Sequence, residues 1–216
     1  MRLLLPFLSC CFLYVCCVSA QNDPLSDIVE KERLFRSQVQ QVSAHVLTQD
    51  YDVLYHRIAW KVDPTKTYIT GTVTTRFSAG IDHFKALHFD CASQLKINEV
   101  LWHGQSLTWS QAVKDILRID LPAALAAGSV DSITVRYEGA PVGTGFGSFA
   151  RSTHGAGNPI LWTFSVPYGG GSWWPCKVDA NDKIDSVDIA ITTPAAYRAA
   201  SNGKLIGETL NGNEKT

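Results

Sequence analysis

The chain has no excess of charge of either sign. Its 216 residues carry 19 Lys and Arg against 20 Asp and Glu, a formal net charge of −1. Binding to nucleic acid or to an anionic membrane through phosphate groups requires a concentration of positive charge. The composition therefore offers no electrostatic support for either class, and we expect no nucleic acid partner.

Motifs for holding a metal are also lacking. None of the six histidines begins a His-Glu-x-x-His motif, which would place two zinc ligands and a general base on one face of a helix. His83 and His88 are five residues apart in a strand-like segment, and an odd separation directs their side chains to opposite faces. We therefore expect no catalytic residue and no metal site in this chain.

Regularly spaced acids are the other pattern that suggests a metal. Four aspartates recur every three residues near the C-terminus, at Asp179, Asp182, Asp185 and Asp188. The residues between them do not follow a calcium-loop pattern, and Lys177 and Lys183 neutralise part of their charge. Capping of turns is the favoured interpretation, with calcium binding as the alternative.

The first twenty residues differ from the rest. Arg2 precedes an almost unbroken apolar run from Leu3 to Val18, which ends in the short side chains of Val18-Ser19-Ala20. This pattern predicts a signal peptide over residues 1–20, cleaved after Ala20, and hence a secreted or periplasmic protein without a membrane span after cleavage. A membrane anchor is the first alternative, although the run is short for a spanning helix. Lipid attachment through one of the early cysteines is the second.

Removal of this leader would leave few cysteines. Four of the six lie within it, so the mature chain would keep Cys91 and Cys176. Export permits a disulfide between them. Two buried free thiols are the other interpretation.

Periodicity divides the remaining chain into two parts. Over residues 21–48, apolar side chains recur at three- and four-residue spacing after Asp23 and Pro24, which predicts one amphipathic helix leading into the body. From residue 49 to 216 the period becomes two, with β-branched and aromatic residues between turn residues. The expected strands are 51–60, 68–77, 86–89, 95–101, 106–109, 116–121, 132–137, 186–192 and 204–210. Residues 122–127 are the one short helical candidate in this part.

Many short strands without alternating helices predict a mainly β fold, an antiparallel saddle or sandwich-like domain. Near its end, Asn211-Gly212 is a strong signal for a β-hairpin. Because only four residues follow Gly212, we expect a β domain that is incomplete at its C-terminus, with a frayed tail as the alternative.

One segment is unusually rich in tryptophan and glycine. Three of the six tryptophans, Trp162, Trp173 and Trp174, surround the run Gly169-Gly-Gly171. Glycine lets backbone pass close to another group, and adjacent tryptophans are too apolar for a solvated loop. We expect an ordered, buried loop here.

This segment and several others resemble a known family. The region from Tyr51 to Gly203 resembles the N-terminal β domain of secreted zinc aminopeptidases of the aminopeptidase N type, closest to the bacterial branch. The matching stretches are Tyr51–Pro64, Ile69–Gly71, Tyr137–Pro141, Gly145–Phe149, Leu161–Gly169, Trp173–Lys177, Asp182–Ser186 and Ala200–Gly203. Their order and spacing, more than any one of them, make the resemblance specific.

The resemblance implies a role and an absence. In the family, a thermolysin-like domain follows and carries the zinc motif, which these 216 residues lack. The resemblance therefore implies zinc only in a missing catalytic domain, and a chain that by itself does not hydrolyse peptides. It also implies a substrate-cleft loop at Val166, Pro167, Tyr168 and Gly169, which would face the N-terminus of a peptide substrate.

The chain departs from the family at one position of this loop. The residue just before the proline is usually an acid or amide that binds the free α-amino group of the substrate. Here it is Val166, whose side chain accepts no hydrogen bond. Two alternatives to a peptidase part remain: a non-catalytic exported β-sandwich binding module, and an unrelated carbohydrate-binding sandwich that stacks sugars on tryptophan.

Overall fold

The computed structural model describes residue 29 and residues 48–143, 148–166, 168–179 and 181–216. The expected signal peptide over 1–20, nearly all of the expected helix over 21–48, and Pro167 lie outside the described residues. Within the described part, no helix is long and apolar enough to cross a membrane. The fold is mainly β, as expected, and consists of three sheets.

The largest sheet has eight strands in the order β12-β13-β11-β1-β2-β8-β4-β5. Its strands are β1 (Tyr51–Val62), β2 (Ile69–Ala79), β4 (Lys96–Trp102), β5 (Gln105–Ser106), β8 (Val130–Gly139), β11 (Ser186–Pro194), β12 (Leu210–Asn211) and β13 (Glu214–Lys215). All neighbours pair antiparallel except β1 and β11, which run parallel. The expectation of an antiparallel domain therefore holds for the other pairs and fails for β1 and β11, since the chain returns to the β1 edge only after a long excursion.

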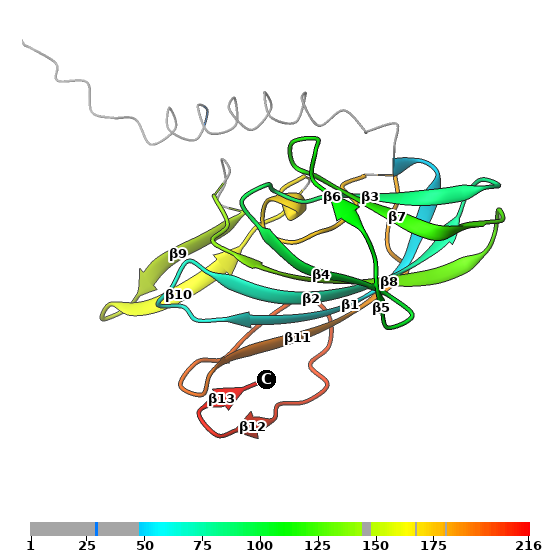
Figure 1. Cartoon of the computed structure of the whole chain (residues 1–216). Helices are drawn as coiled ribbons and strands as arrows, with labels where there is room; N and C mark the ends of the chain where they lie inside the picture. Colours follow the sequence, from blue (N-terminus) through cyan, green and yellow to red (C-terminus); the bar gives the residue numbers. More distant parts are fainter. Residues whose placement is uncertain (1–28, 30–47, 144–147, 167, 180) are drawn as a thin grey trace, which may run out of the picture.

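Two smaller sheets complete the fold. One contains β3 (Phe84–Asp90), β7 (Ile116–Leu125) and β6 (Trp109–Ser110), and the other is the hairpin of β9 (Phe149–His154) and β10 (Asn158–Thr163). Figure 1 shows the three-stranded sheet above the large sheet, and the hairpin projecting to one side. The main core contains residues of both multi-stranded sheets, among them Val73, Phe77, Leu87 and Ile119.

The alternation of side chains explains this core. Along β2, the odd-numbered positions from Ile69 to Ala79 are all buried, while the even-numbered positions are exposed or half-buried. Strands place successive side chains on opposite faces, so the period-two sequence pattern puts one apolar face into the core. The strand prediction for this segment is confirmed.

In β1 the buried positions shift from odd-numbered to even-numbered residues. Tyr51 and Val53 are buried, but a register shift between Val53 and Tyr55 moves the next buried positions to His56 and Ile58. A β-bulge inserts one residue and reverses the alternation after it. The bulge thus turns a histidine inward where a simple alternating reading would have placed Tyr55.

Two local expectations are wrong. Residues 122–127 do not form a helix, because β7 continues to Leu125 before a turn. The expected strand 204–210 is reduced to β12, and the residues before Leu210 have no regular structure. The expected strands also do not include β9 and β10, which form a hairpin with Gly155 and Gly157 at positive φ in its turn.

The Asn211-Gly212 hairpin is confirmed. Leu210 pairs with Lys215 and Asn211 with Glu214, and Gly212 has φ of 59°. Thr209 and Thr216 exchange both backbone hydrogen bonds, at 2.8 and 2.9 Å. The return strand is therefore present in β13, which also pairs with β11.

Candidate functional site

The predicted cleft loop follows β10 directly. Val166 is 66% exposed, whereas Tyr168 and Gly169 are half-buried. The amide of Gly169 donates to the carbonyl of Ser165 at 2.8 Å, which closes the loop on itself. The loop therefore presents an apolar side chain to solvent from a hydrogen-bonded turn.

Two serines hold this turn beside the start of β9. The hydroxyl of Ser172 lies 2.6 Å from the hydroxyl of Ser148 and donates to the carbonyl of Gly169 at 2.7 Å. A Cβ atom at Gly169 would lie 3.2 Å from the Cβ of Ser148 and from the Cα of Ser165. A side chain at position 169 would thus crowd the contact that places the loop.

The glycines after the loop are buried for a packing reason. Gly170 and Gly171 form a short 3-10 helix with Ser172, and both are buried. A Cβ at Gly170 would lie 2.8 Å from the Sγ of Cys176, and one at Gly171 would lie 2.7 Å from the Cβ of Asp90. The glycine run therefore permits close packing of this turn against β3 and the Trp-Trp-Pro-Cys segment, rather than close approach of a ligand.

Trp173 and Trp174 pack on β1. The ring of Trp60 lies 4.6 Å from that of Trp173 and 5.9 Å from that of Trp174, between ring centroids. The indole N–H of Trp173 donates to the hydroxyl of Ser165 at 2.8 Å, and Trp173 is only 5% exposed. The expectation of an ordered, buried loop is confirmed for Trp173, whose ring forms the floor beneath the cleft loop and not an exposed wall.

A buried ion pair anchors the segment that follows. Lys177 and Asp182 form a salt bridge with side chains only 4% and 7% exposed. The ammonium also donates to the carbonyl of Tyr51 at 2.6 Å, and the Asp182 carboxylate accepts the amide of Val53 at 3.2 Å. The network ties the segment after the tryptophans to the start of β1.

The other aspartates of the regular series do not gather around an ion. Asp179 accepts the amide of Asn181, as expected of a turn cap, and Asp188 accepts the hydroxyl of Tyr55. Across the described residues, no group of three or more His, Cys, Asp or Glu side chains has the arrangement of a metal site. Calcium binding by this series has no support in the geometry.

The histidines and cysteines have separate environments. His83 is exposed, His88 half-buried, and His154 exposed at the end of β9. Cys91 and Cys176 are buried free thiols, and burial raises the pKa of Cys91 to about 12. Such thiols remain protonated and are poor nucleophiles.

His56 is a buried residue that the sequence patterns did not reveal. It is 1% exposed, its Nδ1 lies 3.0 Å from the hydroxyl of Thr75, and its ring meets Trp174 edge to face at 5.2 Å. Burial lowers the pKa of His56 to about 4, so the ring is neutral at pH 7. Only the bulge in β1, which has no clear sequence signal, places it inside.

A cavity of about 220 Å³ lies beside Trp60 and Trp173. Its walls come from the end of β1, from β10, from β11 and from the loop over 197–201. The three described residues of the predicted cleft loop, Val166, Tyr168 and Gly169, do not line it. The cavity and the loop are therefore separate features.

Comparison with solved structures finds proteins with a similar fold. An M1 zinc metallopeptidase from Deinococcus radiodurans matches with a TM-score of 0.66 and 21% identity, over 78% of this chain and 38% of its own. The fold is that of one part of an M1 zinc metallopeptidase. A two-domain M1 zinc metallopeptidase variant bound to L-arginine matches with a TM-score of 0.67 and 22% identity, over 78% of this chain and 38% of that one.

A further M1 zinc metallopeptidase structure from Deinococcus radiodurans contains a Tyr-Ser-Ala substrate. It matches with a TM-score of 0.64 and 21% identity, over 77% of this chain and 38% of that one. This chain thus spans well under half the length of the M1 structures it matches. No protein-family model matches the chain, and no curated protein does.

Proposed function

We propose that this chain is the N-terminal β domain of a secreted zinc metallo-aminopeptidase, and that it forms one wall of the cleft for a peptide N-terminus. The zinc ion and the hydrolytic step belong to a thermolysin-like domain outside these residues. The fold shared with M1 zinc metallopeptidases over 77–78% of the chain carries the proposal. The apolar leader of residues 1–20 supports export.

The seating of the loop after β10 supports a role at the cleft. Its backbone is held by the Ser165–Gly169 hydrogen bond and by the hydroxyl of Ser172, and Trp173 packs beneath it. A surface that orients a substrate benefits from such a rigid base. The matched structures bound to Tyr-Ser-Ala, L-arginine and L-tryptophan make peptides and amino acids the ligand class to test.

Val166 determines which contacts this loop can make with a substrate. Its exposed side chain supplies apolar contact and no acceptor for an ammonium group. In this proposal the loop shapes the cleft through Tyr168 and the backbone of Gly169, and recognition of the amine belongs to the catalytic domain.

The first test concerns hydrolysis. The purified 216-residue chain, assayed with aminoacyl anilides with added zinc and with a chelator, is expected to show no zinc-dependent release of the aniline. A chelator-sensitive activity of the chain alone would contradict the division of roles.

Reading the DNA downstream of codon 216 distinguishes a part of a peptidase from a non-catalytic binding module. An in-frame His-Glu-x-x-His supports a peptidase, and a stop codon without one favours a non-catalytic binding module.

The second test concerns the loop, in a longer product that contains the zinc domain. Val166→Glu should lower KM for free-amine substrates about tenfold, because a carboxylate hydrogen bond to an ammonium is worth about 1.5–3 kcal/mol. Val187→Glu is the matched control, since Val187 is 46% exposed and lies on β11 away from the loop. Equal KM values for the two variants would show that position 166 does not face the substrate amine.

A further inference from the structure

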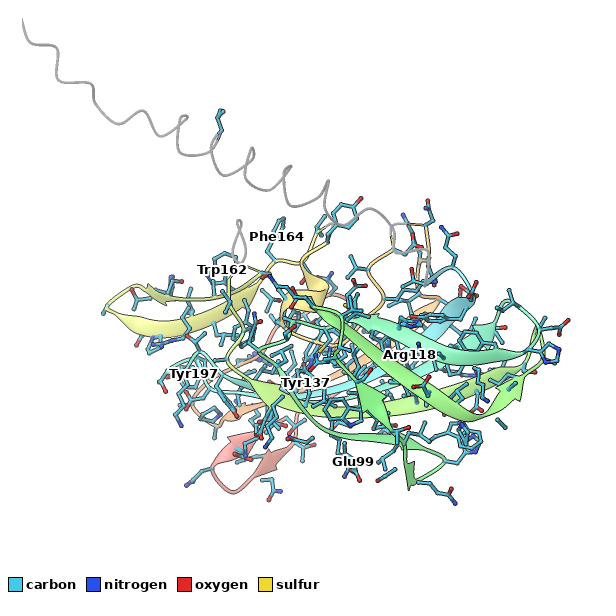
Figure 2. The ribbon with its side chains drawn as sticks, turned by 45° about the horizontal axis from the view of Figure 1, so that its top comes forward. Glu99, Arg118, Tyr137, Trp162, Phe164 and Tyr197 are labelled. Carbon is cyan, nitrogen blue, oxygen red and sulfur yellow. The ribbon has the colours of Figure 1, made fainter. Side chains whose placement is uncertain are left out.

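The cavity beside β10 is lined by aromatic and aliphatic side chains together with polar groups. Trp60, Trp162, Trp173 and Tyr197 supply aromatic surface, and Leu161 is among the aliphatic side chains between them. Figure 2 shows Trp162 on β10 and Tyr197 on the loop that follows β11, so the aromatic walls come from segments distant in sequence. Ligand pockets in proteins are typically concave and combine apolar side chains with a few polar groups.

The polar groups of two of these rings are already satisfied within the chain. The indole N–H of Trp60 donates to the hydroxyl of Tyr137 at 3.0 Å, and that of Trp173 donates to the hydroxyl of Ser165 at 2.8 Å. These rings therefore offer their carbon atoms to an occupant of the cavity and do not demand an acceptor from it.

Among the described residues of the lining, only Arg198 is charged, and its charge is paired within the chain. Arg198 donates to both carboxylate oxygens of Glu208, through Nε at 3.0 Å and a terminal nitrogen at 2.8 Å. A two-bond pair of this kind places a carboxylate of the chain itself against the guanidinium charge.

The cavity is also accessible. Ala199 and Ala200 belong to its lining and are exposed to solvent, so the loop over 197–201 forms a mouth of small side chains. A cavity of about 150 Å³ lined by aliphatic and aromatic groups holds benzene. The volume of about 220 Å³ here is suited to one further ring.

We propose that this cavity is a binding site for one small, uncharged aromatic molecule of about the size of indole. The site is separate from the proposed peptide cleft, and it involves neither zinc nor the loop around Val166. Its occupant is held by contact with Trp60, Trp162 and Tyr197 and enters past Ala199 and Ala200.

Calorimetric titration of the full chain with indole tests the site without zinc or peptide, so its result is independent of the proposed function. The expected result is saturable binding with one indole per chain. Indole-3-acetate and tryptamine should bind at least tenfold more weakly, because each would place a charge against the apolar lining. Absence of saturation with indole, or equal binding of the charged analogues, would overturn the proposal.

Three variants locate the bound molecule. Ala200→Trp should obstruct the mouth, and Tyr197→Ala should remove an aromatic wall, so each is expected to weaken indole binding at least tenfold. Ala126→Trp is the matched control, because Ala126 is exposed and does not line the cavity. Thermal unfolding of each variant verifies that it is folded. An equal loss in the control, or full binding by both cavity variants, would place the indole elsewhere.

Discussion

At the scale of single residues, the buried glycines at positions 170 and 171 leave no room for a side chain. Gly170→Ala would bring a methyl group within 2.8 Å of the Sγ of Cys176, and Gly171→Ala would bring one within 2.7 Å of the Cβ of Asp90. Overpacking of this kind costs about 1–3 kcal/mol. We therefore expect each variant to lower the free energy of unfolding by that amount in urea titrations.

Gly207→Ala is the control for these variants. No atom lies within 4 Å of a Cβ built at position 207. Its free energy of unfolding should equal that of the unaltered chain or exceed it slightly, since alanine restricts the unfolded state. Equal destabilisation by all three alanines would show that tight packing is not what requires glycine at 170 and 171.

The second prediction at this scale is a pH dependence from His56. Its pKa is about 4 in the folded chain, against an ordinary value of 6.5. Between these values the unfolded chain binds a proton that the folded chain does not, so stability rises with pH through this window. Acidification from pH 7 to pH 4 should cost on the order of 3 kcal/mol.

The measurement is the urea midpoint between pH 4 and pH 7.5. His56→Phe keeps a ring against Trp174 but cannot titrate, so its stability should vary less across the window. An identical pH profile for the variant and the unaltered chain would assign the effect to other groups.

At the scale of elements, the buried ion pair of Lys177 and Asp182 joins the segment after the tryptophans to β1. Lys177→Met would leave the Asp182 carboxylate buried without its cation. Removal of one partner from a buried pair costs about 3–5 kcal/mol, mainly through the uncompensated charge. We expect a loss of this size in chemical unfolding.

Lys96→Met provides the comparison. Lys96 pairs with Glu138 at 3.5 Å, and its side chain is 73% exposed. Exposed pairs contribute about 0–1 kcal/mol, because water and salt screen them. If the two methionine variants lose equal stability, the tie between the segment and β1 is not the main role of Lys177.

At the scale of the whole molecule, the open edge of the large sheet predicts association. β12 is the outermost strand, and Leu205, Ile206 and Leu210 in and before it are 66%, 91% and 66% exposed. Unpaired, apolar strand edges are templates for pairing with another chain. The purified chain should therefore form concentration-dependent oligomers, measurable by light scattering after size-exclusion chromatography.

Leu210→Lys should shift this equilibrium toward the monomer, because a charge on the edge strand β12 opposes pairing. Val113→Lys is the control, since Val113 is also exposed, at 58%, but precedes β7 in the smaller sheet. A monomer at high concentration that binds no dye for apolar surfaces would contradict this prediction.

Much of the strand arrangement was predictable. The long β-branched run of β2 and the hairpin at Asn211-Gly212 appear as expected, because period-two patterning and turn chemistry act within a few residues. The β9–β10 hairpin was not among the expected strands. The segment over 204–209 was read as strand, but propensity alone does not provide it with a paired neighbour.

The candidate site was predictable only in part. The residues of the loop could be named from the resemblance, but its support by Ser148 and Trp173 depends on contacts from the residue before β9 and from a later turn. The cavity could not be inferred, because its lining comes from several separate segments between Trp60 and Ser201.

The sequence by itself determined the mainly β class, the positions of most strands and the lack of zinc-binding motifs in this chain, because each depends on local pattern or residue identity. Only the tertiary structure decided that β1 and β11 pair in parallel, that a bulge buries His56, and that the glycine run packs against Asp90 and Cys176. These features depend on which distant segments meet, and the free energy of that choice comes from burial in a shared core.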